Sequence, residues 1–471
     1  MKSRGAAAWV LPAAVGLLAA CCAIALLRIV STIGLMVPFD PNEGWNAYHA
    51  TAAMAGGSPY PSPPSFMTNN YPPLSFYIVG ALGRALGDMI VAGRLLSLAA
   101  FVAIAGCISV TLRMFACSAV DAAFGALIFA ACLLLNSDYV GMNDPQLLGH
   151  AIAMAGLLLV LRQPRDVPTL ATAALLFTLA FFVKHNLIVL PLSVTVWLAL
   201  YDRRIALRLA FSGAAFLIVG LIAFRVIYGF DLLRTLHSAR VFAFHDLLVN
   251  LSLWLIWGLL PLVVAGALFA VRRDDKYVVL CALYVLMSFI VGVSYFGGAG
   301  VDVNAMFDAD IALALAGGLA LNRFADRGVG ATSAIVGACL LPLAIGLWTN
   351  FNADWFDGNY WLHPMRDEAV AVKEDIAFLH THNGPALCET LAYCYWAGKA
   401  PEVDVFNSGQ QFATQSRNDN VLVRMVETHY FSAMQFDTLS PFALGSRVRQ
   451  AVDRAYRIDH SNDDGVFLVP R

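Results

Sequence analysis

The sequence predicts a polytopic α-helical membrane protein that ends in a small α/β domain. Hydrophobic residues make up 59% of the 471 residues, and Asp, Glu, Lys and Arg together make up 13%. That charged share is about half of what soluble globular domains carry. Long apolar runs recur up to about residue 350, and the stretch that follows is far more polar. The net charge of −2 and the lack of a basic tract argue against nucleic acid as a partner.

The first apolar run follows Lys2 and Arg4 and continues to Leu27. A bilayer span needs about 20 apolar residues, so this run is long enough to cross, and further spans follow it. We therefore expect an uncleaved first span near residues 8–30 instead of a signal peptide, with the N-terminus inside.

Ten further apolar segments bring the expected number of spans to about eleven. They lie near residues 89–112, 117–136, 146–161, 168–183, 187–201, 207–228, 247–271, 277–296, 305–321 and 329–349. Lys and Arg concentrate on the cytoplasmic side of membrane proteins. Every turn that this arrangement places inside is basic, as Arg113, Arg162, Arg203, Arg272 and Arg323 illustrate. The odd number of spans then places residues 351–471 outside the cytoplasm.

The segment 74–87 is apolar but shorter than the about 20 residues that a span needs. A span here would move Arg113 and every later basic turn to the outside. We therefore expect this segment to lie along the outer face as a juxtamembrane helix.

The first external loop, residues 37–88, begins with two carboxylates, Asp40 and Glu43. An aromatic-rich helix should follow to about Ala55 and end at a Gly-Gly pair. Asp, Pro and Glu at these spacings form a helix-capping pattern, which is one explanation of the carboxylates. The other is catalytic, because partial burial at the membrane surface raises the pKa of a carboxylate towards the range of a general base.

Other polar side chains fall on the same predicted face. Asn143 and Asp144 stand before a span, where Asp144 either caps the helix or takes part in function. Lys184 and His185 stand at the outer end of another span. The tendency of Lys and Arg to lie on the cytoplasmic side does not explain a cation at this position. Lys184 either snorkels to lipid headgroups or binds an anion such as a lipid phosphate.

A Gly-rich turn at residues 297–304 contains Asp302 and Asn304. It is either a plain turn or a place where the backbone approaches a ligand. Aromatic residues of the first loop, among them Trp45 and Tyr71, form either an interfacial belt or a surface on which a sugar stacks.

The C-terminal stretch has the alternating pattern of a small α/β domain. We expect helices at 365–382, 390–398 and 421–431 and strands at 384–389, 402–406 and 465–469. Cys388 and Cys394 either remain unpaired or form a disulfide, depending on the compartment.

Several short motifs together resemble the GT-C superfamily of integral membrane glycosyltransferases, in particular protein O-mannosyltransferases and lipid A aminoarabinose transferases. The motifs are the acidic residues after the first span, Asn70-Tyr71-Pro72-Pro73-Leu74, Ala92-Gly93-Arg94-Leu95-Leu96-Ser97, and Asp144 in a later external loop. The resemblance covers the membrane part to about residue 350. Where the family carries Asp then Glu, this chain has Asn42 and Glu43. Tyr71 stands where some relatives have a Lys that meets the lipid phosphate.

The resemblance implies a hexosyl- or pentosyltransferase with a polyprenyl-phosphate-linked sugar donor. The sugar would pass, with inversion, to a hydroxyl of a glycan, lipid or protein at the outer face of a bacterial inner membrane. Glu43 would be the base, with Asp40 second, and Asp144 would orient the acceptor or help hold a metal. Candidates for the donor phosphate are Lys184, His185, Arg225, Arg240 and Tyr71, and those for the substrate pocket are Trp45, Asn46, Asn143, Asp302 and Asn304.

Carboxylates on one face suit a hard divalent cation such as Mg²⁺ or Mn²⁺, but the ligand set is too small to assign one. The main alternative to an enzyme is a transporter, a lipid-binding protein or an assembly factor. A transporter would carry ionisable residues in the middle of its spans and often internal repeats. The gathering of ionisable residues at one face favours an enzyme, whereas Asn42 keeps a non-catalytic relative as an alternative.

Overall fold

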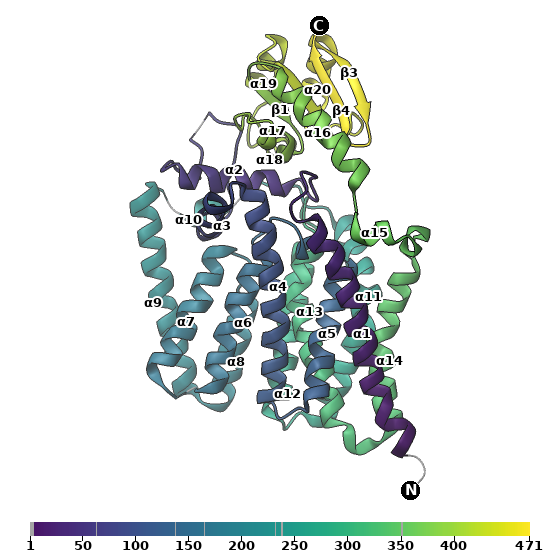
Figure 1. The fold of residues 1–471 in the computed structure, drawn as a ribbon. Coiled ribbons are helices and arrows are strands. Elements are labelled where there is room, and N and C mark those ends of the chain that lie inside the picture. Colours follow the sequence, from purple (N-terminus) through teal and green to yellow (C-terminus); the bar gives the residue numbers. More distant parts are fainter. Residues whose placement is uncertain are drawn as a thin grey trace.

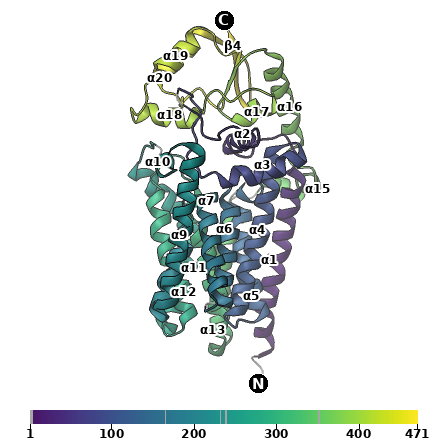
Figure 2. The same cartoon turned by 90° about the vertical axis from the view of Figure 1, so that its left-hand side faces the viewer.

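A bundle of long helices carries a smaller sheet-containing domain at one end (Figure 1). The computed structural model describes residues 4–62, 64–136, 138–163, 165–230, 232–236, 239–349 and 352–471. The N-terminus lies at one end of the bundle and the C-terminal domain at the other, and the perpendicular view agrees (Figure 2).

Each expected span corresponds to one helix of the bundle. These helices are α1 (Arg4–Thr32), α4 (Met89–Met114), α5 (Ala119–Asn136), α6 (Gln146–Arg162), α7 (Val167–Val183), α8 (Val189–Tyr201), α9 (Arg203–Tyr228), α11 (Phe244–Arg272), α12 (Lys276–Tyr295), α13 (Phe307–Arg323) and α14 (Val329–Thr349). Within the described residues, seven segments are long and apolar enough to cross a bilayer, and α5 to α8 are shorter apolar helices that pack beside them. The chain is therefore a multi-pass membrane protein.

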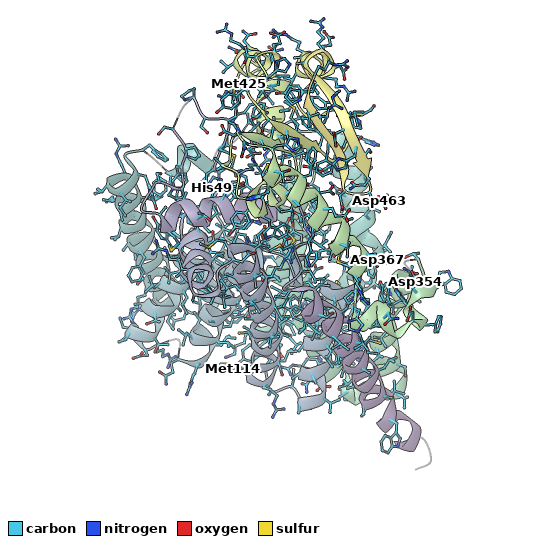
Figure 3. The ribbon with its side chains drawn as sticks, turned by 45° about the horizontal axis from the view of Figure 1, so that its top comes forward. His49, Met114, Asp354, Asp367, Met425 and Asp463 are labelled. Carbon is cyan, nitrogen blue, oxygen red and sulfur yellow. A yellow bond between two sulfur atoms is a disulfide. The ribbon has the colours of Figure 1, made fainter. Side chains whose placement is uncertain are left out.

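Basic residues meet at the end of the bundle that lies away from the C-terminal domain. Arg323 of α13 donates to the carbonyl of Phe115, just after α4, and Arg272 of α11 donates to the carbonyl of Arg323. Figure 3 shows Met114, the last residue of α4, far from His49 near the opposite end. Both the basic turns and their common end agree with the arrangement expected from the sequence.

Two short helices, α2 (Asn42–Met54) and α3 (Leu74–Leu86), lie across the other end of the bundle, beneath the C-terminal domain (Figures 1 and 2). Helix α3 packs against α2, α4 and the long helix α7, and it lies across the end of the bundle (Figures 1 and 2). This agrees with the juxtamembrane placement expected for residues 74–87.

The C-terminal domain contains a four-stranded sheet. Its elements are η4 (Ala353–Phe356), α15 (Gly358–Leu362), α16 (Arg366–Thr381), β1 (Ala386–Cys388), α17 (Leu391–Trp396), α18 (Val405–Ala413), α19 (Asn420–Glu427), β2 (Ala433–Phe436), α20 (Ser446–Ala455), β3 (Tyr456–Asn462) and β4 (Gly465–Pro470). The strand order is β1-β2-β4-β3, with β1 and β2 parallel and the other neighbours antiparallel. Cys388 and Cys394 form a disulfide with a Cα–Cα distance of 5.9 Å. The expected domain boundary at 350/351 lies outside the described residues.

One expected element of this domain is wrong, and strands β2 and β3 and helices α18 and α20 were not expected. Residues 402–406 do not form a strand of the sheet: Val403 makes an isolated bridge to Phe66 of the first loop, and α18 begins at Val405. Strand β2 is buried throughout and lacks alternation, and β3 is a largely polar edge strand, so neither shows the pattern of a half-buried strand.

Candidate active site

Glu43 of α2 is fully buried and bonded to Arg94 of α4. Arg94 donates from Nε to one carboxylate oxygen (2.7 Å) and from an Nη to the other (2.6 Å). The backbone N–H groups of Asn143 and Phe39 each donate to the same carboxylate at 2.9 Å. Both side chains are 0% exposed, and Arg94 also donates to three carbonyls of the segment after α1. This bidentate, charge-assisted pair fastens the first loop to α4.

The motif around Arg94 joins the two acidic loops to each other. A Cβ at Gly93 would overlap the side chain of Asn143, so this position admits only glycine at the observed approach. Ser97 donates to the carbonyl of Asp144 at 3.0 Å, and Asn46 donates to the carbonyl of Asn143 at 2.9 Å. Asn46 and Asn143, expected in the substrate pocket, are buried and serve these contacts.

Asp40 lies eight residues after the end of α1 and is only partly buried. Its carboxylate accepts from the N–H of Asn42 at 2.7 Å, so it orders the start of α2. Burial raises the pKa of Asp40 to about 6; the hydrogen bonds from Asn42 oppose this shift, and the charge of Asp144 adds to it. A carboxylate with this pKa and remaining access suits a general base.

A second buried pair connects Lys184, just after α7, to Asp144. The Lys184 Nζ lies 3.0 and 3.2 Å from the two Asp144 oxygens, and 5.0 Å from the ring centre of Tyr71. Lys184 is 4% exposed, so the snorkelling alternative does not apply to it. Burial alone would lower the pKa of Lys184, but the Asp144 carboxylate raises it above the ordinary value, so the ammonium stays charged.

His185 stands beside this pair, with its ring centre 6.3 Å from that of Tyr71. Burial, with the charge of Lys184, lowers the pKa of His185 to about 4, so the ring is neutral at pH 7. Among the described residues, its buried Nδ1 has no hydrogen-bond partner. Such an atom is ready to bond a ligand.

These groups converge on one site. Tyr139, in the short η1 helix (Asp138–Val140), is buried, and burial raises the pKa of its hydroxyl well above the ordinary value, with the charges of Asp144 and Asp302 adding to the shift. Tyr139 was not singled out in the sequence analysis.

The C-terminal domain packs against the loop that carries Arg240. The Arg240 guanidinium lies 4.7 Å from the ring centre of Phe406 in α18, and it donates to the carbonyl of Ala299 at 3.3 Å. Gln410, one turn later, accepts from the N–H of Val241 at 2.9 Å. Arg240 also interacts with Tyr71, which brings it to the edge of the site.

Asp404 ties this domain to the first loop. It is 3% exposed and accepts from the indole N–H of Trp45 and the hydroxyl of Thr68, both at 3.0 Å. Trp45 itself packs edge-on against Tyr71 with ring centres 5.0 Å apart. Trp45 is therefore buried and supports Tyr71 from one side, whereas it was expected from the sequence in the substrate pocket.

The remaining candidates lie at the margin. Arg225 is exposed in the last turn of α9. Asp302 is exposed and caps the short helix η2 (Val303–Met306), which contains Asn304. Within the described part of the chain, no group of three or more His, Cys, Asp or Glu residues is arranged to hold a metal ion.

Comparisons with known proteins show the fold. No family model and no curated protein matches the chain. The crystal structure of ArnT from Cupriavidus metallidurans bound to undecaprenyl phosphate is similar, with a TM-score of 0.59 at 12% identity over 96% of this chain and 97% of that chain. ArnT is a lipid A aminoarabinose transferase.

The oligosaccharyltransferase of Archaeoglobus fulgidus in its apo form is also similar, with a TM-score of 0.56 at 11% identity over 91% of this chain and 70% of that chain. Its complex with an inhibitory peptide and a dolichol-phosphate gives 0.53 at 12% identity, over 97% and 74% of the two chains. This chain has the GT-C fold. At these identities the likeness establishes architecture alone, which agrees with the resemblance of the short motifs.

Proposed function

We propose that this protein is a glycosyltransferase that moves a sugar from a polyprenyl-phosphate donor to an acceptor hydroxyl, with inversion at the anomeric carbon. The observation that carries the proposal is the site itself. An accessible carboxylate with a pKa of about 6, Asp40, stands in one site with the cations Lys184 and Arg240. The GT-C fold and the lipid phosphates bound by ArnT and the archaeal enzyme support a lipid-linked donor.

In this proposal Asp40, and not Glu43, is the base. Both Glu43 oxygens already accept charge-assisted or backbone hydrogen bonds, and its side chain has no exposed surface. A proton acceptor must come within about 3 Å of the hydroxyl it deprotonates, which a fully enclosed carboxylate does not permit. Asp40 takes the acceptor proton while the acceptor oxygen attacks the anomeric carbon. The bond from that carbon to the phosphate breaks, and its electron pair leaves on the phosphate.

The departing lipid phosphate gains negative charge, which nearby cations stabilise. Lys184 is paired with Asp144 and contributes N–H donors, and Arg240 adds a second cation. Neutral His185 adds a further donor or acceptor through its unpartnered Nδ1. Asp144 thus positions Lys184, and it does not bind the acceptor directly.

Two variants of Asp40 test this function. Asp40→Asn removes the base but keeps an oxygen that accepts from Asn42, so turnover of labelled polyprenyl-phosphate sugars should fall by roughly 10²–10⁴-fold with the protein still folded. Asp40→Glu should retain part of the activity. Full turnover in Asp40→Asn would remove Asp40 from the mechanism.

We further propose that the site faces the outside of a bacterial inner membrane, with the N-terminus inside and residues 351–471 outside. The basic turns at the opposite end of the bundle support this orientation. A reporter that is active only in the periplasm should be active when it is fused after Arg471. Activity of a cytoplasm-only reporter at that position would reverse the orientation.

A further inference from the structure

A cavity of about 1270 Å³ lies between α1, α5, α11 and α14, close to the active site. In Figure 1 these helices stand on the right of the bundle, whereas α7 and α9 stand on the left. The described residues that line the cavity include none of Lys184, Tyr71 and Arg240. The cavity is therefore separate from the cationic cluster assigned to the donor phosphate.

One end of this cavity lies beside the start of the first loop. Pro38 and Phe39 line it, and Asp40 follows them directly in the chain. Asp138 and Asp302 line the same cavity, and Asp302 shares the surroundings of Tyr139 with Asp40. A hydroxyl held at this end would lie near the turn that carries Asp40, although Asp40 itself is not among the described residues that line the cavity.

The charged residues of the lining are mostly acidic. Asp138, Asp302, Asp310 and Glu368 contribute carboxylates, against one cation, Arg28. A phosphate or another anionic headgroup would be disfavoured beside this excess of carboxylates. Carboxylates instead accept hydrogen bonds from hydroxyl groups.

The polar part of the cavity lining also contains aromatic rings and one N–H donor without a partner among the described residues. Trp254 donates to Asp310 at 3.2 Å, and the Arg28 guanidinium lies 4.6 Å from the ring centre of Tyr360. The buried Nε of Arg28 has no hydrogen-bond partner among the described residues. Flat rings beside hydroxyl-binding groups suit a ligand with an apolar face and a hydroxylated edge, such as a sugar.

The other part of the cavity is apolar and open towards the bilayer. Ile24 of α1, Leu253 and Ile256 of α11, and Ile345 of α14 line it and are also 42–55% exposed. In a membrane protein such residues face lipid. A ligand can therefore enter sideways from the bilayer and leave its hydrocarbon tail among these helices.

We propose that this cavity binds the acceptor, and that the acceptor is a membrane amphiphile with an uncharged, hydroxyl-bearing headgroup, such as a neutral glycolipid. This inference rests on the proposed function. The acceptor hydroxyl oxygen forms the new bond to the anomeric carbon, its proton passes to Asp40, and the donor phosphate leaves on the opposite side with the electron pair.

Photocrosslinking in lipid nanodiscs tests the site without turnover. The probe is a long-chain alkyl glycoside with a diazirine in its chain, and its comparison probe carries a phosphate in place of the sugar. The neutral probe should label peptides of α1, α11 and α14. Leu253→Trp and Ile345→Trp fill the apolar part, so each should reduce this labelling by about tenfold or more.

Ile218→Trp on α9 is the matched control, because Ile218 is 55% exposed but does not line the cavity. The neutral probe should label the Ile218→Trp variant as strongly as the parent protein. Asp138→Asn with Asp302→Asn should let the phosphate probe label the same peptides, which it does poorly in the parent. Equal labelling by both probes in the parent, or undiminished labelling in both cavity-filling variants, would overturn the inference.

Failure of this inference is distinguishable from failure of the proposed function. If donor turnover depends on Asp40 while the cavity-filling variants glycosylate a soluble peptide as well as the parent does, the enzyme is retained and the lipid acceptor is excluded. If the cavity binds the neutral probe but no Asp40 variant changes turnover, the site exists but the base assignment fails.

Discussion

Replacing Glu43 by Gln should destabilise the protein, because the carboxylate balances a fully buried arginine. Arg94 and two backbone N–H groups supply four donated hydrogen bonds to Glu43. Gln offers one oxygen, and its amide NH₂ must face a donor, so at least one buried N–H loses its acceptor. Breaking one side of a buried ion pair costs about 3–5 kcal/mol. Glu43→Gln should therefore lower the apparent Tm and the yield of monodisperse protein.

Size-exclusion chromatography after heating in detergent measures this effect. Arg94→Met alone should be similarly damaging, and the double variant Glu43→Gln/Arg94→Met should lose clearly less stability than the two singles added together, since contacting residues are not additive. Asp40→Asn is the matched control and should keep the Tm of the parent. A Glu43→Gln protein with the parent Tm and no turnover would refute this reasoning and make Glu43 the base.

Three further outcomes follow from the site. Because Asp40 acts only when it is deprotonated and its pKa is about 6, kcat/KM should rise by about tenfold between pH 5 and pH 7, and a flat profile in this range would exclude Asp40 as the base. Lys184→Met should weaken donor use by about tenfold or more, and adding Asp144→Asn should restore the Tm but not donor use; recovered donor use would make Lys184 purely structural. Phe406→Ala should raise KM for the donor with little change in kcat, because Arg240 loses its contact with the Phe406 ring. Phe406→Trp should have steady-state constants close to those of the parent. Equal KM values in the parent and both variants would show that α18 does not contribute to the donor site.

The membrane helices could be predicted from the sequence because lipid imposes a strong constraint on each of them. A spanning segment must be long, apolar and helical, so eleven runs of about the right length gave eleven helices. The short elements of the C-terminal domain lack such a constraint. The composition of residues 402–406 is compatible with a strand or with the start of a helix. In the structure, Asp404 accepts from the N–H of Asn407 and caps α18.

The sequence was sufficient to predict which residues form the site, but not what each of them does. The sequence singled out Glu43, Asp40, Asp144 and Lys184, yet their roles depend on partners that are distant in the chain. Arg94 is 51 residues from Glu43 and makes that carboxylate inaccessible. Asp404, far along the chain, bonds Trp45 across 359 residues, and no local pattern signals such a contact.

The proposed inversion sets a requirement on where charges stand around the sugar. In such a reaction the nucleophile enters opposite the leaving group, so the base and the cations that receive the phosphate must stand on opposite sides of the sugar. The cations are carried by the end of α7 and by the loop before α11, and the acidic cavity lies among α1, α5, α11 and α14. The first loop is fastened to α4 through Glu43 and Arg94, and Asp40 follows directly after Pro38 and Phe39, which line the acidic cavity. Under this proposal the buried ion pair serves the chemistry indirectly, because it fixes where the base stands relative to both substrates.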